Sequence, residues 1–171
     1  IKMDKKSKSI LQHKIKTAEE VTEIIGIFPR KNKAILCHGT FDIVHPGHIR
    51  HLLHAKTQCK TLIVSITSDN YNSKTKYRPF VPENLRAYNI AALEVVDFVV
   101  IDNNEKPLEL ISFLKPDYFA KGYEYNAEDK VHHKTQEELR VVEKYGGEVV
   151  FTPGDIVSVS YTHLRAHETN S

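Results

Sequence analysis

The feature that most constrains the fold of this chain is a junction between an apolar run and a helical pattern. Residues 33–37 read Lys-Ala-Ile-Leu-Cys, residues 38–48 read His-Gly-Thr-Phe-Asp-Ile-Val-His-Pro-Gly-His, and a helical pattern follows. The junction predicts a strand, a tight turn at Gly39 and the N-terminus of a helix. Unpaired N–H groups and the positive end of the helix dipole favour an anion such as a phosphate group there. Because His45 and His48 are three residues apart on one face of the first turn, both can donate hydrogen bonds to phosphate oxygens.

The rest of the chain alternates between apolar runs and helical patterns. The run at 61–67 is almost continuously apolar, as in parallel strands covered on both faces, and its distance from the first strand predicts a right-handed crossover. Expected helices lie at 17–26 (opened by a capping box at Thr17), 46–60, 82–93, 107–114 and 135–145, and expected strands at 33–37, 61–67, 98–101, 117–120 and 148–151. We therefore expect a doubly wound, Rossmann-like α/β fold. Its parallel sheet should have about five strands, with ligands at their carboxyl ends.

Composition excludes several classes of protein. A chain of 171 residues is the size of one domain, and its net charge of +2 is too balanced to indicate a nucleic-acid surface. Two cysteines, Cys37 and Cys59, cannot form a disulfide framework, and Cys37 is expected to be a buried apolar residue. The sequence has no secretory signal and no apolar run of membrane length. We expect a cytoplasmic protein with no membrane and no nucleic-acid partner.

A basic loop follows the second expected strand. Residues 70–79 are too charged for a core and too long for a tight turn, and long loops at the carboxyl edge of a parallel sheet are usually functional. Its cations Lys74, Lys76 and Arg78 either face a bound phosphate or form a solvated surface. Arg86, in the next helix, either clamps a phosphate with two hydrogen bonds or pairs with a neighbour on its own helix.

Two further patterns invite a different interpretation. His45, His48, His51 and His54 repeat at a spacing of three, which suggests zinc, but at about 100° per residue they fan around the helix and cannot close a four-ligand site. We expect no metal held by the protein itself. The basic stretch 5–9 is interpreted as a tail.

The run 39–48 resembles the signature of the cytidylyltransferase-like nucleotidyltransferases. Ten matching residues at a predicted strand-to-helix junction are far more specific than a lone His-x-Gly-His. The segments 77–86, 91–97 and 120–125 are similar to the branch of this family that acts on sugar 1-phosphates such as heptose 1-phosphate. The resemblance covers roughly 33 to 158, which is most of the chain.

This resemblance implies an enzyme that transfers a nucleoside monophosphate, AMP being favoured, from a nucleoside triphosphate (ATP or CTP) to a sugar 1-phosphate, releasing pyrophosphate. Mg²⁺ is expected to enter bound to the nucleotide, and a homodimer is implied. Transfer of CMP to glycerol 3-phosphate is the alternative within enzymes. A nucleotide-binding module without catalysis is the alternative outside them.

The resemblance also assigns roles to individual residues. The implied catalytic residues are His45, His48 and Lys74. The implied nucleotide-binding residues are Gly39, Thr40, Phe41, Asp42, Gly47, Lys76, Arg86, Lys121 and Gly122. Asp42 has a second interpretation from its residue type, because an aspartate in a turn can fix that turn through its own backbone.

Both ends of the chain look unlike the middle. Residues 1–32 are interpreted as a leading basic segment with one helix, the remnant of an upstream domain, and 33–158 as the nucleotidyltransferase domain. Residues 159–171 resemble the translation of a sequencing adapter and are interpreted as a non-native tail. Because relatives close the site with a Ser/Thr-rich segment at this point, we expect weakened turnover from the chain as it stands.

Overall fold

A computed structural model describes residues 3–71, 79–122 and 133–153 of the chain. The helices are α1 (Lys5–Gln12), α2 (Ala18–Ile25), α3 (Pro46–Gln58), α4 (Glu83–Ala91), α5 (Leu108–Leu114) and α6 (His133–Lys144), with a 3₁₀ turn at Asp69–Tyr71. The strands are β1 (Ala34–Gly39), β2 (Thr61–Thr67), β3 (Phe98–Asp102), β4 (Tyr118–Gly122) and β5 (Glu148–Thr152). Each strand and each of the five expected helices lies where the sequence predicted it, with ends that differ by a few residues.

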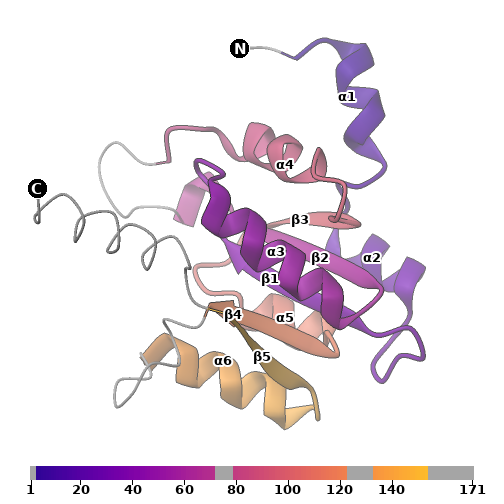
Figure 1. Cartoon of the computed structure of the whole chain (residues 1–171), viewed down its shortest axis with the longest axis vertical. Coiled ribbons are helices and arrows are strands. Elements are labelled where there is room, and N and C mark those ends of the chain that lie inside the picture. The colour runs from indigo at the N-terminus through magenta and orange to yellow at the C-terminus, as the bar shows by residue number, and fades with distance from the viewer. Residues whose placement is uncertain (1–2, 72–78, 123–132, 154–171) are drawn as a thin grey trace, which may run out of the picture.

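The five strands form one parallel sheet in the order β3-β2-β1-β4-β5 (Figure 1). The chain first winds outward from β1 through β2 to β3, and then returns to the other side of β1 to add β4 and β5. Strand order therefore reverses between β1 and β4, and in such sheets the crevice at the carboxyl ends beside the reversal binds the ligand. The predicted doubly wound α/β fold is confirmed.

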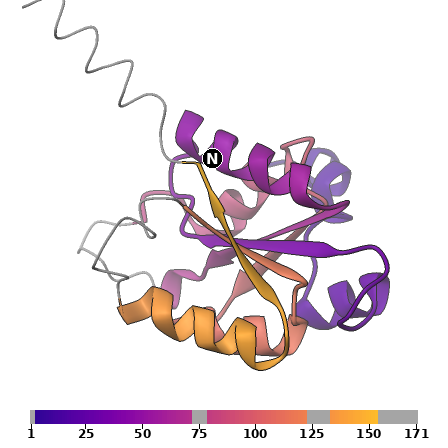
Figure 2. The same cartoon turned by 60° about the horizontal axis from the view of Figure 1, so that its bottom comes forward.

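Helices cover both faces of the sheet (Figure 2). One core cluster joins Leu52 and Ala55 of α3 and Ile90 of α4 to one face, and a second joins Val21 of α2 and Ile111 of α5 to the other. This double cover explains why the strands read as nearly continuous apolar runs. Cys37 is fully buried in β1, as expected, and burial raises the pKa of its thiol.

The start of α2 follows the predicted capping box. Thr17 Oγ1 accepts the N–H of Glu20 at 3.2 Å, and Glu20 Oε2 accepts the N–H of Thr17 at 2.9 Å. The helix ends at Gly26, whose positive φ of 78° suits a residue without a Cβ.

The interpretation of residues 5–9 as a tail was wrong. They belong to α1, which Asp4 caps by accepting the N–H of Ser7 at 2.9 Å. Beyond α1, Ile15 pairs in parallel with Val99 at the free edge of β3, and Tyr88 donates its hydroxyl to Gln12 at 2.9 Å. The residues after α1 therefore hold the leading segment at the edge of the sheet through contacts with residues far away in the sequence, which the sequence of the segment alone did not indicate.

Candidate functional site

The sharp turn between β1 and α3 forms the centre of the candidate site. Gly39 ends β1, and Phe41 adopts φ = 50°, a left-handed conformation that side chains with a Cβ rarely take. The ring of Phe41 is 4% exposed and lies in the core beneath the turn. A Cβ on Gly39 would lie 3.0 Å from this ring, so Gly39 gives space to Phe41. Strain of this kind persists where the surrounding packing enforces it, and it is frequent at functional sites.

The two histidines of the motif are brought together as expected. Their rings stack with centroids 3.7 Å apart at an interplanar angle of 23°. His45 is the N-cap of α3, and its Nδ1 accepts the N–H of Gly47 at 3.1 Å, while His48 Nδ1 accepts the N–H of His45 at 3.4 Å. Because Nδ1 of His45 is an acceptor, its neutral ring carries the proton on Nε2. The exposed His45 ring therefore offers an N–H donor at the mouth of the helix.

His48 lies deeper than His45. Its ring meets Phe41 edge-on with centroids 5.0 Å apart. Burial, followed by the neighbouring imidazole of His45, lowers the pKa of His48, and the carbonyl of Ile43 opposes this shift. His48 is therefore biased toward the neutral form, which can act as a hydrogen-bond donor without a fixed charge.

The structure gives a local reason for a glycine at position 47, which the sequence did not reveal. A Cβ at this position would lie 2.9 Å from Cε1 of His45 and 3.0 Å from its Nδ1. The absence of a Cβ at Gly47 therefore leaves space for the His45 ring, independently of any contact with a ligand.

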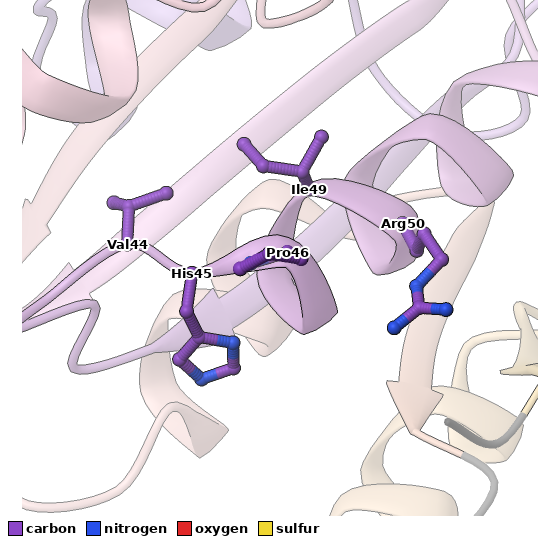
Figure 3. Close-up of a pocket in the computed structure, with 5 residues that line it drawn as sticks. All are labelled: Val44, His45, Pro46, Ile49 and Arg50. Atoms are coloured by element: carbon purple, nitrogen blue, oxygen red, sulfur yellow. The ribbon is translucent and has the colours of Figure 1, made fainter. Parts of the chain in front are cut away.

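An open pocket of about 590 Å³ lies against the first turn of α3. Figure 3 shows the His45 ring and the Arg50 guanidinium extending from one side of this segment, and Val44 and Ile49 from the other. Arg50 adds a cation near the paired imidazoles. Sequence reasoning overlooked it, although its place one turn into a helix with a phosphate-binding pattern was a usable signal.

Arg86 is not placed as the predicted phosphate clamp. Its side chain is 0% exposed, and its Nη1 donates to the carbonyls of Thr40 and Thr67, both at 2.8 Å. Its Nε donates to the carbonyl of Val81 at 2.8 Å, and its Nη2 pairs with Asp69 at 2.6 Å. The alternative of a partner within its own helix was also wrong. Arg86 ties the β1–α3 turn, the end of β2 and the start of α4 together, so it shapes the walls of the site.

Asp42 braces the same region from the other side. Its two carboxylate oxygens accept the N–H groups of Phe80, at 3.0 Å, and Val81, at 2.9 Å. This long-range contact with the segment before α4 is a role of Asp42 that the sequence did not predict. From the sequence alone, an aspartate that stabilises its own turn cannot be distinguished from one that accepts hydrogen bonds from a segment almost 40 residues away.

A polar row at the carboxyl ends of the strands was missed. His38 Nδ1 lies 2.7 Å from Ser65 Oγ, and His38 Nε2 lies 3.4 Å from Thr67 Oγ1. Burial, with a smaller contribution from the Lys121 ammonium, lowers the pKa of His38 to about 4. The signal was present in the sequence, because polar residues at alternate positions of β2 and at the end of β1 interrupt otherwise apolar runs.

Lys121 and Gly122 end β4 at this same rim. Lys121 Nζ pairs with Glu138 of α6 at 2.6 Å, and its carbonyl accepts the hydroxyl of Thr152 at 3.2 Å. The expected position of Lys121 at the rim is therefore found, together with an acidic partner that the sequence did not suggest. Lys74, Lys76 and Arg78 lie outside the described residues.

The four histidines of α3 do not form a shared metal site. His51 Nδ1 lies 2.7 Å from Thr152 Oγ1 of β5, away from the stacked pair. Within residues 3–71, 79–122 and 133–153, no three histidine, cysteine or acidic side chains are placed to hold a metal ion. In the same part of the chain, no helix is both long enough and apolar enough to cross a bilayer.

A parallel sheet with a reversal of strand order, and with imidazoles and a helix N-terminus at its carboxyl edge, defines the chain as a doubly wound α/β protein with a site whose chemistry suits phosphate groups. Comparison with known families gives a match over residues 36–165 to the family described as Cytidylyltransferase-like. The chain belongs to the cytidylyltransferase-like family, as the sequence motif predicted.

Two curated relatives are both named bifunctional protein HldE. The one from Aliarcobacter butzleri is 37% identical over 136 residues, which cover 78% of this chain and 29% of the relative. The one from Campylobacter jejuni subsp. doylei is 44% identical over 122 residues, or 70% of this chain and 26% of the relative. The chain thus spans less than a third of the length of these relatives.

Comparison with solved structures supports the same fold. A lipopolysaccharide core biosynthesis protein from Thermoplasma volcanium superimposes with a TM-score of 0.58 at 26% identity, covering 72% of this chain and 97% of that one. A pantoate-beta-alanine ligase from Francisella tularensis gives a TM-score of 0.57 at 14% identity, covering 81% and 66%, and therefore shares the fold.

Proposed function

We propose that the chain transfers a nucleoside monophosphate, AMP being favoured, from a nucleoside triphosphate to a sugar 1-phosphate such as heptose 1-phosphate, with release of pyrophosphate. The observation that carries the proposal is the stacked His45–His48 pair at the N-terminus of α3, in a member of the cytidylyltransferase-like family. The similarity to bifunctional HldE proteins and to a lipopolysaccharide core biosynthesis protein supports a sugar phosphate as acceptor.

In the proposed reaction, a phosphate oxygen of the acceptor attacks the α-phosphorus of the triphosphate. The bond from that phosphorus to the bridging oxygen breaks, and the electron pair leaves with pyrophosphate. No covalent bond to the protein forms, so catalysis consists of positioning and charge stabilisation. The Nε2–H of His45, the imidazole of His48 and the N-terminus of α3 are the donors that meet charge developing on the phosphate oxygens.

The resemblance assigns further contacts around this centre. The backbone of Gly39, Thr40 and Phe41 is proposed to line the nucleotide, with Lys121 and Gly122 at the base or sugar. Lys74 and Lys76 are proposed to bind phosphate oxygens. Arg86 and Asp42 support these elements through the hydrogen bonds described above and are not assigned direct contacts.

Mg²⁺ is proposed to arrive with the triphosphate. It would neutralise phosphate charge and be held mainly by phosphate oxygens and water. The site, with imidazoles and a helix N-terminus rather than a carboxylate cage, suits a cation brought in by its ligand. A homodimer is also proposed, and sedimentation analysis of the purified chain tests it.

The proposed activity is tested by measuring pyrophosphate release from four substrate pairs: ATP or CTP, each with heptose 1-phosphate or glycerol 3-phosphate. The proposal predicts the highest kcat/KM for ATP with heptose 1-phosphate. Preference for CTP with glycerol 3-phosphate would replace the substrate assignment while keeping the reaction. Nucleotide binding without pyrophosphate release from any pair would leave only a binding module.

A further inference from the structure

The ion pair between Lys121 and Glu138 is unusual because its acidic residue, Glu138, is buried. Glu138 is 6% exposed and lies on the buried side of α6, between Thr135, at 1%, and Val142, at 0%. A helix position with such neighbours normally carries an apolar side chain. Compared with apolar residues of similar size, a buried ion pair usually contributes little to stability. Packing and stability therefore do not explain why position 138 carries a carboxylate.

The main chain of Lys121 is already fixed without Glu138. Lys121 pairs with Phe151 in the β4–β5 ladder, and its carbonyl accepts the Thr152 hydroxyl. Thr152 in turn contacts His51 of α3. The contact of Glu138 is therefore with the lysine side chain and not with its main chain. This side chain is 17% exposed and also lies over the ring of Phe119, 5.9 Å from its centroid.

The place where the ammonium is held adjoins the candidate site. Cys37 pairs with Ala120 across β1 and β4, so the next residues along, His38 and Lys121, follow at the carboxyl rim. The Lys121 charge contributes to the lowered pKa of His38, which agrees with their proximity. His38 directly precedes Gly39, the first residue of the turn that leads to the histidine pair.

We propose that Glu138 is a positioning residue that holds the Lys121 ammonium at the carboxyl rim of β4, beside His38, in the orientation in which Lys121 meets the bound nucleotide. The role of the nucleotide rests on the proposed function, whereas the orientation of the lysine rests on the ion pair itself. Glu138 acts only through Lys121 and touches no reacting atom.

The first test compares E138L with E137L. Glu137 is the adjacent residue on α6 and also pairs with a lysine, Lys106, at 2.8 Å, so it is a matched control for removing an ion pair from this helix. Leucine suits the buried stripe at position 138, and the thermal unfolding midpoint verifies that the variant folds. We expect E138L to raise the KM for the nucleotide about tenfold with little change in kcat, and E137L to leave both unchanged.

A double-mutant cycle and a conservative variant separate positioning from a general effect on structure. In a K121M background, E138L should cause no further rise in KM, since its effect passes through the lysine. E138Q keeps an oxygen acceptor and should recover most of the lost affinity. An unchanged KM in E138L, an equal rise in E137L, or full additivity with K121M would overturn the proposal.

A second readout does not depend on activity. NMR titration of the His38 ring should give a higher pKa in K121M, because the nearby charge is gone, and also in E138L, because the ammonium is no longer held there. E137L should not change it. An unchanged or lower His38 pKa in E138L would contradict the positioning role, whereas absence of pyrophosphate release from every substrate pair would refute the proposed function alone.

Discussion

The buried guanidinium of Arg86 shows at the scale of one residue how the site is assembled. It donates to three carbonyls and pairs with Asp69, so it joins the β1–α3 turn, the end of β2 and the segment before α4. R86M leaves these acceptors unpaired, and we expect the free energy of unfolding to fall by about 3 to 5 kcal/mol. Urea denaturation measures this change. The matched substitution R140M, at an exposed position of α6, should change it by less than about 0.5 kcal/mol.

His38 predicts a pH dependence of stability. Its pKa is about 4 in the folded protein against 6.5 for an ordinary histidine. The unfolded chain therefore takes up a proton as the pH falls through 6.5, while the folded chain does so only near 4, and stability is lost across this window. The loss from this one group amounts to about 3 kcal/mol, since each pH unit is worth about 1.4 kcal/mol.

Urea denaturation between pH 7 and pH 4.5 tests this dependence. H38N should flatten the slope of unfolding free energy against pH, whereas H13N, at an exposed position, should leave the slope as in the wild type. Identical slopes in all three proteins would contradict the buried neutral state of His38. The lowered pKa of His48 acts in the same direction and is common to all three proteins.

At the scale of an element, the first turn of α3 depends on the space that Gly47 leaves for His45. G47A would place a methyl group 2.9 Å from that ring, so the ring must rotate away from its stack on His48. Alanine is a better helix former than glycine, which offsets the loss of the hydrogen bond from the Gly47 N–H to the His45 ring, so stability should change little. We expect kcat/KM for pyrophosphate release to fall about a hundredfold without a lower unfolding midpoint. A parallel loss of stability and activity would indicate general disruption instead.

Elements were predictable to different degrees, for physical reasons. Continuous apolar runs identified the five strands, and the capping box at Thr17 identified the start of α2, because both signals are local. The hydrogen bonds of Arg86 to Thr40 and of Asp42 to Val81 were not predicted, since these partners lie about 40 or more residues away in the sequence. The Lys121–Glu138 pair was missed for the same reason.

At the scale of the whole molecule, the leading segment is part of the packed structure. Ile15 pairs with the free edge of β3 and packs against the core, whereas Ile10 of α1 is 68% exposed. We expect I15A to lower the free energy of unfolding by about 2 kcal/mol and the matched I10A to change it by less than about 0.5 kcal/mol. Equal effects in the two variants would show that the segment does not pack as described.

The contact of Ile15 also covers part of the free edge of β3, and covering a strand edge limits its pairing with other chains.

The order of the strands brings the functional groups together. Because the sheet reverses between β1 and β4, the histidine turn, the Lys121 rim and the end of β2 meet at one edge. If phosphate chemistry takes place at this edge, it depends most directly on the imidazole of His48, which lies at the first turn of α3.

The most direct measurement is pyrophosphate release by H48A, compared with the wild type and with H54A, which changes a histidine further along α3. If the His48 imidazole stabilises charge in the transition state, kcat should fall by two to three orders of magnitude, roughly 3 to 4 kcal/mol, with the unfolding midpoint unchanged. H54A should retain wild-type turnover. Near-normal kcat in H48A would contradict the assignment of nucleotidyl transfer to this helix N-terminus.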